Sequence, residues 1–336
     1  MARLKLRMPA EWEPHRATWL AWPHERTDWP GKFAPIPWLY GEIVRHLARA
    51  ELVRIFVQDE TAERGAIAIL RKCHADLAAV EFVRQTTNRS WTRDYCPLFV
   101  KDTRGGLVAT HWRFNAWAKY ENWCEDHAAG GVAARYSGAR VIEPEFVLEG
   151  GSIDVNGAGK LLTTEECLLS DVQARNPGLG RKGIERALAK YLGVTEVIWL
   201  GAGIAGDDTH GHVDDIARFT SADTVVAAVE PDCSEANHEP LKENLGRLRA
   251  RGDLRIVTLP MPEPIYFAGQ RLPASYANFY IANRMVLVPT FGDPNDRVAL
   301  NTLARLFADR EVIGVPCRDL VLGLGTLHCM TMQEPI

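Results

Sequence analysis

The chain has 336 residues, of which 46% are hydrophobic and 24% charged, and its formal net charge is −4. This composition is typical of a globular protein, and the weak negative charge without a basic cluster argues against nucleic acid as a partner. No apolar run approaches the roughly 20 residues of a membrane span, so no membrane partner is predicted either. The seven cysteines are scattered without a Cys-x-x-Cys pair. This pattern favours free thiols and predicts a cytoplasmic location.

Short apolar runs predict strands along the whole chain, most of them rich in Val, Ile and Leu. They cover residues 52–57, 79–83, 98–100, 107–110, 140–142, 160–163, 196–200, 215–220, 224–229, 254–259, 276–281, 284–288, 311–314 and 319–323. Amphipathic spacing predicts helices between them, at residues 38–50, 61–73, 176–191, 235–251 and 296–307. The even alternation and the lack of a linker predict one domain over residues 1–336, built from a repeated β-rich α/β unit.

A glycine-rich run at residues 201–206 matches the Gly-x-Gly-x-x-Gly pattern of dinucleotide-binding folds. That interpretation requires a helix directly after the run. Asp207 and Asp208 follow instead, in a polar and glycine-broken stretch, and two aspartates would repel a pyrophosphate. The run is therefore interpreted as a flexible turn that presents Asp208.

Residues 209–215 resemble the Thr-His-x-His-x-Asp-His pattern of metallo-β-lactamase-fold hydrolases, in which His210 and His212 would bind zinc. Asp215 stands where that pattern has its last histidine. The fold also needs further ligands downstream, and the remaining His238 and His328 lack a metal-like neighbourhood. No metal is therefore predicted, and a zinc hydrolase is kept as an alternative.

Near the C-terminus, Cys329 ends a glycine-rich approach, Gly-Leu-Gly-Thr-Leu-His-Cys at residues 323–329. Glycines let the backbone pass close to a ligand and allow positive φ, which suits a nucleophilic thiol better than a structural one. Cys96 is a second candidate, but a small buried thiol is the simpler interpretation of that position.

Cys329 becomes informative together with three acidic stretches far upstream, which contain Asp94, Glu149 and Asp214. Two carboxylates, Asp94 and Asp214, would hold both edges of a planar guanidinium cation by charge-assisted hydrogen bonds. His212 would serve as general acid and base, with Glu149 orienting it. Residues two apart share a face of a strand, so His212 and Asp214 are expected to enter one cavity from a strand.

These residues suit hydrolysis through a covalent thiouronium. The Cys329 thiolate attacks the guanidinium carbon, His212 protonates the departing ammonia, and water activated by His212 then releases a ureido product. A bound cation and a protonated His212 would both favour the thiolate. The predicted partner is a small cationic guanidine.

The motifs together resemble the family of agmatine deiminases and Porphyromonas-type peptidylarginine deiminases, in the guanidine-modifying (pentein) superfamily. The similarity runs almost from end to end. It rests on the stretches Met8-Pro9-Ala10-Glu11-Trp12-Glu13-Pro14-His15, Trp19-Leu20-Ala21-Trp22-Pro23, Trp91-Thr92-Arg93-Asp94, Glu149-Gly150-Gly151-Ser152-Ile153, Gly211-His212-Val213-Asp214-Asp215, Pro289-Thr290-Phe291-Gly292-Asp293 and Leu327-His328-Cys329-Met330-Thr331.

The resemblance implies a five-bladed α/β propeller of ββαβ units around a central active site, with no metal or organic cofactor. It assigns the same roles to the Cys, the His and the three carboxylates. It also implies that Trp91 and Asp208 face the stem and the distal amine of the substrate. Arg93 is a substrate-binding candidate as a basic group that could hold a carboxylate, and Gly325 as a point of close backbone approach.

Several positions depart from the family pattern and leave the exact guanidine open; they are Tyr95, Cys96, Asp208, His210, Leu324 and Thr326. Agmatine is the first expectation, with a cationic or neutral distal group favoured by Asp207 and Asp208. The alternatives are a terminal-arginine or peptidylarginine deiminase, a deiminase of another alkylguanidine, an amidinotransferase, and a non-catalytic binding module. The sequence does not determine whether the chain forms a homo-oligomer.

Overall fold

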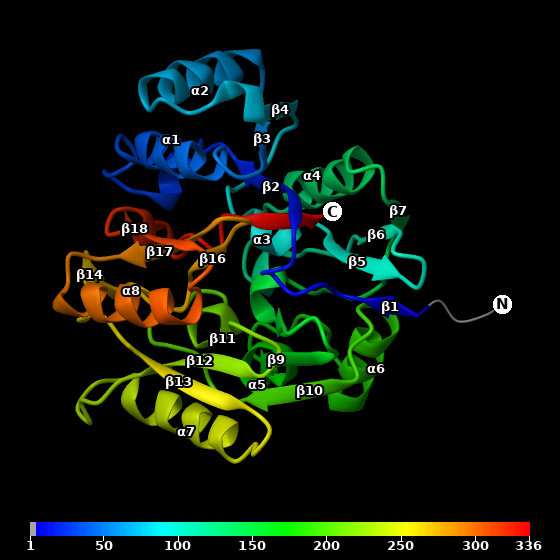
Figure 1. Ribbon diagram of the computed structural model, residues 1–336, viewed down its shortest axis with the longest axis vertical. Helices are drawn as coiled ribbons and strands as arrows, with labels where there is room; N and C mark the ends of the chain where they lie inside the picture. Colours follow the sequence, from blue (N-terminus) through cyan, green and yellow to red (C-terminus); the bar gives the residue numbers. More distant parts are fainter. Residues whose placement is uncertain (1–4) are drawn as a thin grey trace.

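The computed structural model describes residues 5–336 and belongs to the α/β class (Figure 1). Its strands form five sheets of three or four strands and one two-stranded hairpin within that range. The helices are α1 (Ile36–Leu47), α2 (Glu60–Lys72), α3 (Thr92–Tyr95), α4 (Cys124–Tyr136), α5 (Glu165–Leu169), α6 (Arg181–Tyr191), α7 (His238–Arg249) and α8 (Pro294–Leu306).

Four of the larger sheets repeat one order of elements. An antiparallel pair of strands is followed by helix and then by a third strand, which lies parallel to the second strand of the pair. These sheets contain β5 (Leu98–Asp102), β6 (Leu107–Thr110) and β7 (Arg140–Ile142); β8 (Asp154–Val155), β9 (Lys160–Thr164) and β10 (Glu196–Leu200); β11 (Ala217–Phe219), β12 (Thr224–Val229) and β13 (Arg255–Pro260); and β16 (Tyr280–Ile281), β17 (Met285–Thr290) and β18 (Glu311–Pro316). The predicted repeat of a β-rich α/β unit is therefore confirmed.

The fifth sheet joins the two ends of the chain. It has the order β19-β2-β3-β4, in which β19 is antiparallel to β2 and the other pairs are parallel. Its strands are β19 (Met332–Pro335), β2 (His15–Ala21), β3 (Leu52–Val57) and β4 (Val80–Arg84). This pairing fixes the segment just after Cys329 against the N-terminal strand, so the nucleophile candidate sits on an anchored segment.

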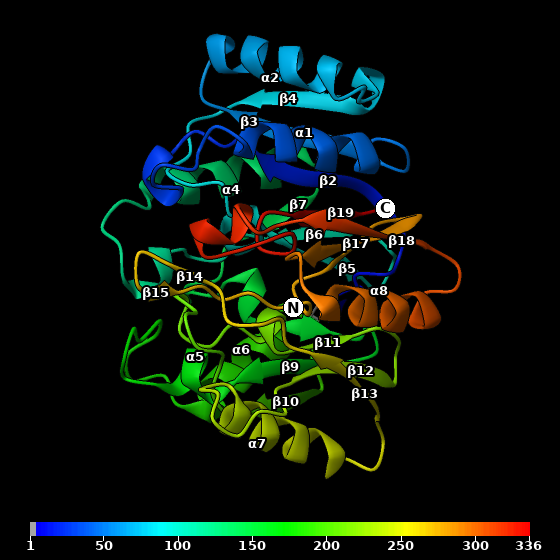
Figure 2. The same cartoon turned by 90° about the vertical axis from the view of Figure 1, so that its left-hand side faces the viewer.

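Three short strands complete the assignment, namely β1 (Leu6–Arg7), β14 (Tyr266–Phe267) and β15 (Gln270–Arg271). The main helices lie on the outside of the molecule, with α1 and α2 at one end and α7 at the other (Figure 2). No helix within residues 5–336 is long and apolar enough to cross a membrane.

Some predicted elements were wrong. Residues 319–323 contain a 3-10 helix, Leu320–Gly323, and the strand predicted at 276–281 shrinks to β16. Helix α4 was missed because its buried face consists of small residues and shows no apolar stripe. A Cβ on Gly130 would lie 2.0 Å from the carbonyl oxygen of Tyr95, so this glycine lets α4 approach the segment that carries Asp94.

Candidate active site

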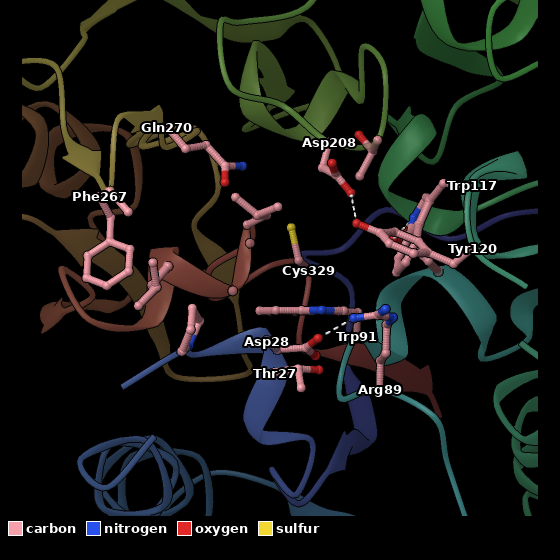
Figure 3. Close-up of a pocket in the computed structure, with 18 residues that line it drawn as sticks. Thr27, Asp28, Arg89, Trp91, Trp117, Tyr120, Asp208, Phe267, Gln270 and Cys329 are labelled. Carbon is pink, nitrogen blue, oxygen red and sulfur yellow. Dashed lines mark hydrogen bonds and ion pairs between the residues drawn. The ribbon is translucent and has the colours of Figure 1, made fainter. Parts of the chain in front are cut away.

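A cavity of about 380 Å³ opens onto the sulfur of Cys329 (Figure 3). Segments from distant parts of the chain line it, and the figure shows their side chains arranged around the thiol. The lining residues that matter for the chemistry are Asp28, Arg89, Trp91, Asp94, Trp117, Tyr120, Asp208, Gly325 and Cys329. Trp91, Asp94, Asp208, Gly325 and Cys329 were all predicted site residues.

The segment before Cys329 packs tightly on two tryptophans. Trp29 donates its indole N–H to the carbonyl of Leu320 at 3.0 Å, and its ring lies 5.7 Å from that of Trp91. A Cβ on Gly325 would lie 3.0 Å from both Trp91 and the Cβ of Cys329. Gly325 therefore lets this segment lie flat against Trp91, which forms one wall of the cavity.

Asn278, which the sequence analysis missed, orders the same segment. Its side-chain oxygen accepts hydrogen bonds from Thr326 Oγ1 at 2.7 Å and from the backbone N–H of His328 at 3.0 Å. Its Nδ2 lies 3.1 Å from the sulfur of Cys329. This explains the threonine at position 326, whose hydroxyl ties the segment to Asn278.

Asp94 is a buried carboxylate whose orientation is fixed from two sides. Its Oδ2 accepts from Trp117 Nε1 at 2.9 Å, and its Oδ1 accepts from the backbone N–H of Gly151 at 3.0 Å. Burial raises the pKa of Asp94 to about 6, opposed by His212 and reinforced by Asp214. A cation in the cavity would favour its ionised form.

Asp214 is held by His328, the residue directly before the thiol. His328 Nδ1 lies 2.6 Å from Asp214 Oδ2, and its Nε2 lies 2.8 Å from Glu11 Oε2. Although burial opposes ionisation, His328 lowers the pKa of Asp214. The other oxygen, Oδ1, is buried and has no hydrogen-bond partner among residues 5–336. A substrate donor would satisfy it.

Gly151 shows how closely the polar groups converge. A Cβ at this position would lie 2.5 Å from His212 Nδ1, 3.0 Å from Asp94 Oδ1 and 3.1 Å from Asp214 Oδ2. Only a residue without a side chain leaves room for the three groups to meet. The structure thus brings together the histidine and both carboxylates, as predicted.

His212 lies between two carboxylates. Its Nδ1 is 3.9 Å from Asp94 Oδ1 and its Nε2 is 3.9 Å from Glu149 Oε2. Burial works against a charged ring, but Asp94, followed by Cys167 and Glu149, raises the pKa of His212 well above its usual range. The neighbouring carboxylates therefore favour the charged form of this ring.

The expectation that His212 and Asp214 share a strand was wrong. His212 precedes a 3-10 turn, Val213–Asp215, and that turn brings both side chains to the site. Asp207 holds the turn, since its Oδ2 accepts from the backbone N–H groups of Gly211 at 2.7 Å and His212 at 3.0 Å. Asp207 thus caps the turn.

Glu149 is paired with Arg175, a residue that the sequence analysis missed. Arg175 Nε donates to Glu149 Oε1 at 2.9 Å, and both side chains are fully buried. Although burial opposes ionisation, Arg175 and His212 lower the pKa of Glu149 to about 2. Glu149 therefore stays ionised beside His212. Nothing in the local sequence around Arg175 marks this role.

The sulfur of Cys329 lies 3.8 Å from Asp214 Oδ2. Burial raises the pKa of the Cys329 thiol well above its usual range, and Asp214, Asp215 and Asp94 add to the effect. Burial and these carboxylates thus favour the thiol over the thiolate. A cation between Asp94 and Asp214 would offset this repulsion.

Arg93 was a predicted substrate-binding residue, but its side chain does not line the cavity. Its guanidinium donates to Gln333 Oε1 at 2.7 Å and lies 3.3 Å from Glu11 Oε2. Its backbone N–H donates to the carbonyl of Cys329 at 3.1 Å. Arg93 therefore joins the Asp94 segment to the nucleophile segment and cannot hold a substrate carboxylate.

Two ion pairs flank the mouth of the cavity. Asp208 is paired with Lys119 and accepts from the hydroxyl of Tyr120 at 2.7 Å. Asp28 is paired with Arg89, whose guanidinium lies 4.3 Å from the centre of the Tyr120 ring. The sequence analysis missed Asp28 and Arg89, which lie outside the recognised motifs.

The zinc alternative finds little support in the geometry. His210 turns away toward Ser170 and Glu166, at 3.2 Å and 3.8 Å, so the His-x-His pair does not converge on one point. Within the described part of the chain, one three-residue group has ligand atoms within 4.8 Å of one another; it consists of Glu149, Cys167 and His212. In that group Arg175 pairs with Oε1 of Glu149, whereas Oε2 has no hydrogen-bond partner among residues 5–336.

Comparison with known proteins agrees with this geometry. Residues 7–335 match the family described as Porphyromonas-type peptidyl-arginine deiminase. The chain is 34% identical to an agmatine deiminase of Pseudomonas aeruginosa, across 98% of this chain and 95% of that protein. A substrate-bound variant of C. jejuni agmatine deiminase superposes with a TM-score of 0.91 at 29% identity, covering 99% and 97% of the two chains. The agmatine deiminase of Enterococcus faecalis gives a TM-score of 0.90 at 30% identity, covering 98% and 96%.

Proposed function

We propose, from the premise that this chain belongs to the Porphyromonas-type peptidyl-arginine deiminase family, that it hydrolyses agmatine to N-carbamoylputrescine and ammonia. The observation that carries the proposal is a buried thiol 3.8 Å from Asp214, beside a buried histidine that lies between the carboxylates of Asp94 and Glu149. A thiol, a histidine and three carboxylates suit hydrolysis of a cationic carbon centre.

In this proposal, binding comes first. Asp94 and Asp214 accept hydrogen bonds from opposite edges of the guanidinium, which supplies a donor to Asp214 Oδ1, an oxygen without a partner among residues 5–336. The cation offsets the carboxylate charges that disfavour the thiolate of Cys329. The thiol releases its proton to solvent as the cation binds, so the pocket makes the nucleophile only when the substrate is in place; the second proton of the attacking water later restores the thiol.

Covalent chemistry follows. The Cys329 sulfur forms a bond to the guanidinium carbon, and His212 gives its proton to the departing nitrogen, which leaves as ammonia. Water then attacks the thiouronium carbon while His212 takes up a proton. The C–S bond breaks, the ureido product leaves, and the thiol is restored. Glu149, kept ionised by Arg175, stabilises the imidazolium that forms in each cycle.

The fold supports a finer proposal as well. The five larger sheets would be the blades of a five-bladed α/β propeller around the central cavity. Their shared strand order supports this arrangement, as does the sheet that joins β19 to β2. Because that sheet uses both ends of the chain, we also propose that residues 1–336 form one domain.

An ammonia-release assay over agmatine, free arginine, arginyl peptides and simple alkylguanidines tests the proposed function. Agmatine should be the best substrate, and Cys329→Ala should reduce its turnover by roughly ten-thousandfold or more while leaving the thermal unfolding transition in place. Cys96→Ala is the matched control, since this buried thiol does not line the cavity. Preferential turnover of arginine or peptides would move the substrate assignment within the family, and turnover by Cys329→Ala would reject the thiol mechanism.

A further inference from the structure

The mouth of the cavity carries two carboxylates that could meet the distal end of a guanidine substrate. Asp28 and Asp208 both line the cavity, and they differ in how far their oxygens are already used. Asp208 was the expected ligand for a distal amine. The contacts described below favour the other carboxylate.

Both oxygens of Asp208 are engaged. Lys119 Nζ donates to Oδ1. The Tyr120 hydroxyl donates to Oδ2 at 2.7 Å, as Figure 3 shows. Lys119 does not line the cavity, so its ammonium neutralises Asp208 without being part of the cavity lining. A substrate ammonium at this position would have to share a carboxylate with an existing cation and a hydroxyl donor.

Asp28 has fewer hydrogen-bond partners than Asp208 and is more deeply buried. Its side chain is 3% exposed, against 15% for Asp208. Arg89 donates to Oδ1, whereas Oδ2 has no hydrogen-bond partner among residues 5–336. A buried carboxylate oxygen without a donor is costly, and an incoming ammonium would supply the missing donor.

The position of Asp28 also suits this role. It ends a 3-10 turn, Arg26–Asp28, and the next residue, Trp29, packs on Trp91 and donates to Leu320. In the view of Figure 3 the Trp91 ring lies between Cys329 and Asp28. Because all three residues line one cavity, an alkyl stem from the reacting carbon would pass the edge of the Trp91 ring to reach this carboxylate.

We infer that Asp28, and not Asp208, binds the distal ammonium of the substrate and thereby selects a diamine-derived guanidine over an uncharged one. The inference rests on the proposed deiminase function and adds its specificity determinant. Arg89, stacked on Tyr120, holds one oxygen of Asp28 and leaves the other for the substrate.

The test compares agmatine with n-pentylguanidine, which replaces the ammonium by a methyl group of similar size. Asp28→Asn should lower kcat/KM for agmatine by about a hundredfold, mostly through KM, and change that for n-pentylguanidine by less than about threefold. Asp208→Asn should lower kcat/KM for agmatine by less than about tenfold. Glu60→Gln is the matched control, because it removes a surface carboxylate that pairs with Arg64 and does not line the cavity.

Equal losses on both substrates in Asp28→Asn would overturn the inference, and so would a selective loss in Asp208→Asn alone. If the wild-type enzyme hydrolyses neither guanidine, the proposed function itself fails. If it hydrolyses both but Asp28→Asn leaves their ratio unchanged, only the inference fails.

The wild-type protein provides a second test that requires no stable variant. Burial raises the pKa of Asp28 to about 7, opposed by Arg89 and reinforced by Glu25 and Asp208. The ratio of kcat/KM for agmatine to that for n-pentylguanidine should fall as pH falls through about 7, because protonated Asp28 loses its attraction for ammonium. Titration of the shared reacting groups cancels in this ratio, and a constant ratio would overturn the inference. The charged and titratable groups that act on Asp28, or on which it acts, are Arg89, Glu25, Asp208, Tyr40, Tyr120 and Asp126.

Discussion

Both ends of the cavity carry buried carboxylates, but the two ends differ in how far these carboxylates are already paired. At the reacting end, the carboxylate oxygens Asp214 Oδ1 and Glu149 Oε2 are buried without hydrogen-bond partners among residues 5–336. At the mouth, Asp28 and Asp208 are already paired with Arg89 and Lys119. The carboxylates at the reacting end are therefore available to bind a cation. The carboxylates at the mouth are largely neutralised, and they can distinguish one substrate from another only through the oxygens that remain unpaired.

This difference predicts that substitutions at the reacting end lower kcat/KM more than substitutions at the mouth. Asp94→Asn and Asp214→Asn should each lower kcat/KM by about a hundredfold or more, and should do so for agmatine and n-pentylguanidine alike, because each removes one charged edge of the guanidinium site. Steady-state kinetics on both substrates measures this. A loss below about fivefold in either variant would place the guanidinium elsewhere.

The next largest loss of activity is expected from substitution of Arg175, the buried cation that pairs with Glu149. Arg175→Gln leaves Glu149 as an uncompensated buried charge, so we expect a fall in kcat of about tenfold or more and a lower melting temperature. Arg175→Lys should recover part of both. Arg181→Gln is the control, since its ion pair with Glu165 lies at the surface. An unchanged kcat in Arg175→Gln would show that Glu149 needs no partner to support His212.

The pH dependence of the reacting end should follow Asp94. Its pKa is raised to about 6, so the carboxylate is present above that pH and is lost as pH falls through it. With n-pentylguanidine as substrate, which removes any contribution of a charged tail, kcat/KM should fall up to about tenfold per pH unit below about 6. A flat profile between about pH 5 and 7 would contradict the assignment of Asp94 to the cation.

Removal of metal ions is expected to have no effect on activity. Activity should survive prolonged treatment with a chelator, because His210 faces Ser170 and Glu166 and does not converge with His212 on one point. Elemental analysis of the purified protein and an activity assay after dialysis measure this. Stoichiometric zinc together with loss of activity on its removal would favour the hydrolytic metal mechanism instead.

The sequence predicted the convergence of Cys329, His212, Glu149, Asp94 and Asp214, because each belongs to a short motif whose chemistry can be interpreted locally. Their catalytic roles stay predictions. Arg93 was misplaced because neighbouring residues on a helical turn point about 100° apart, so the residue next to Asp94 faces the C-terminal segment.

The supporting contacts could not be predicted, since tertiary structure alone creates them. Arg175 reaches Glu149, His328 links Asp214 to Glu11, and Asn278 orders the thiol segment, each across more than 20 residues of sequence. The same holds for β19, which is short and finds its partner at the opposite end of the chain.

The central claim is that the thiol of Cys329 becomes nucleophilic only when a cation occupies the site. The most direct test is labelling with 2-chloroacetamidine, a small amidinium electrophile, followed by peptide mapping by mass spectrometry. We predict one adduct, at Cys329, forming much faster than with the neutral analogue 2-chloroacetamide and strongly slowed in Asp94→Asn. Adduct formation at Cys96 or Cys167, or equal rates for the charged and neutral reagents at Cys329, would contradict the account.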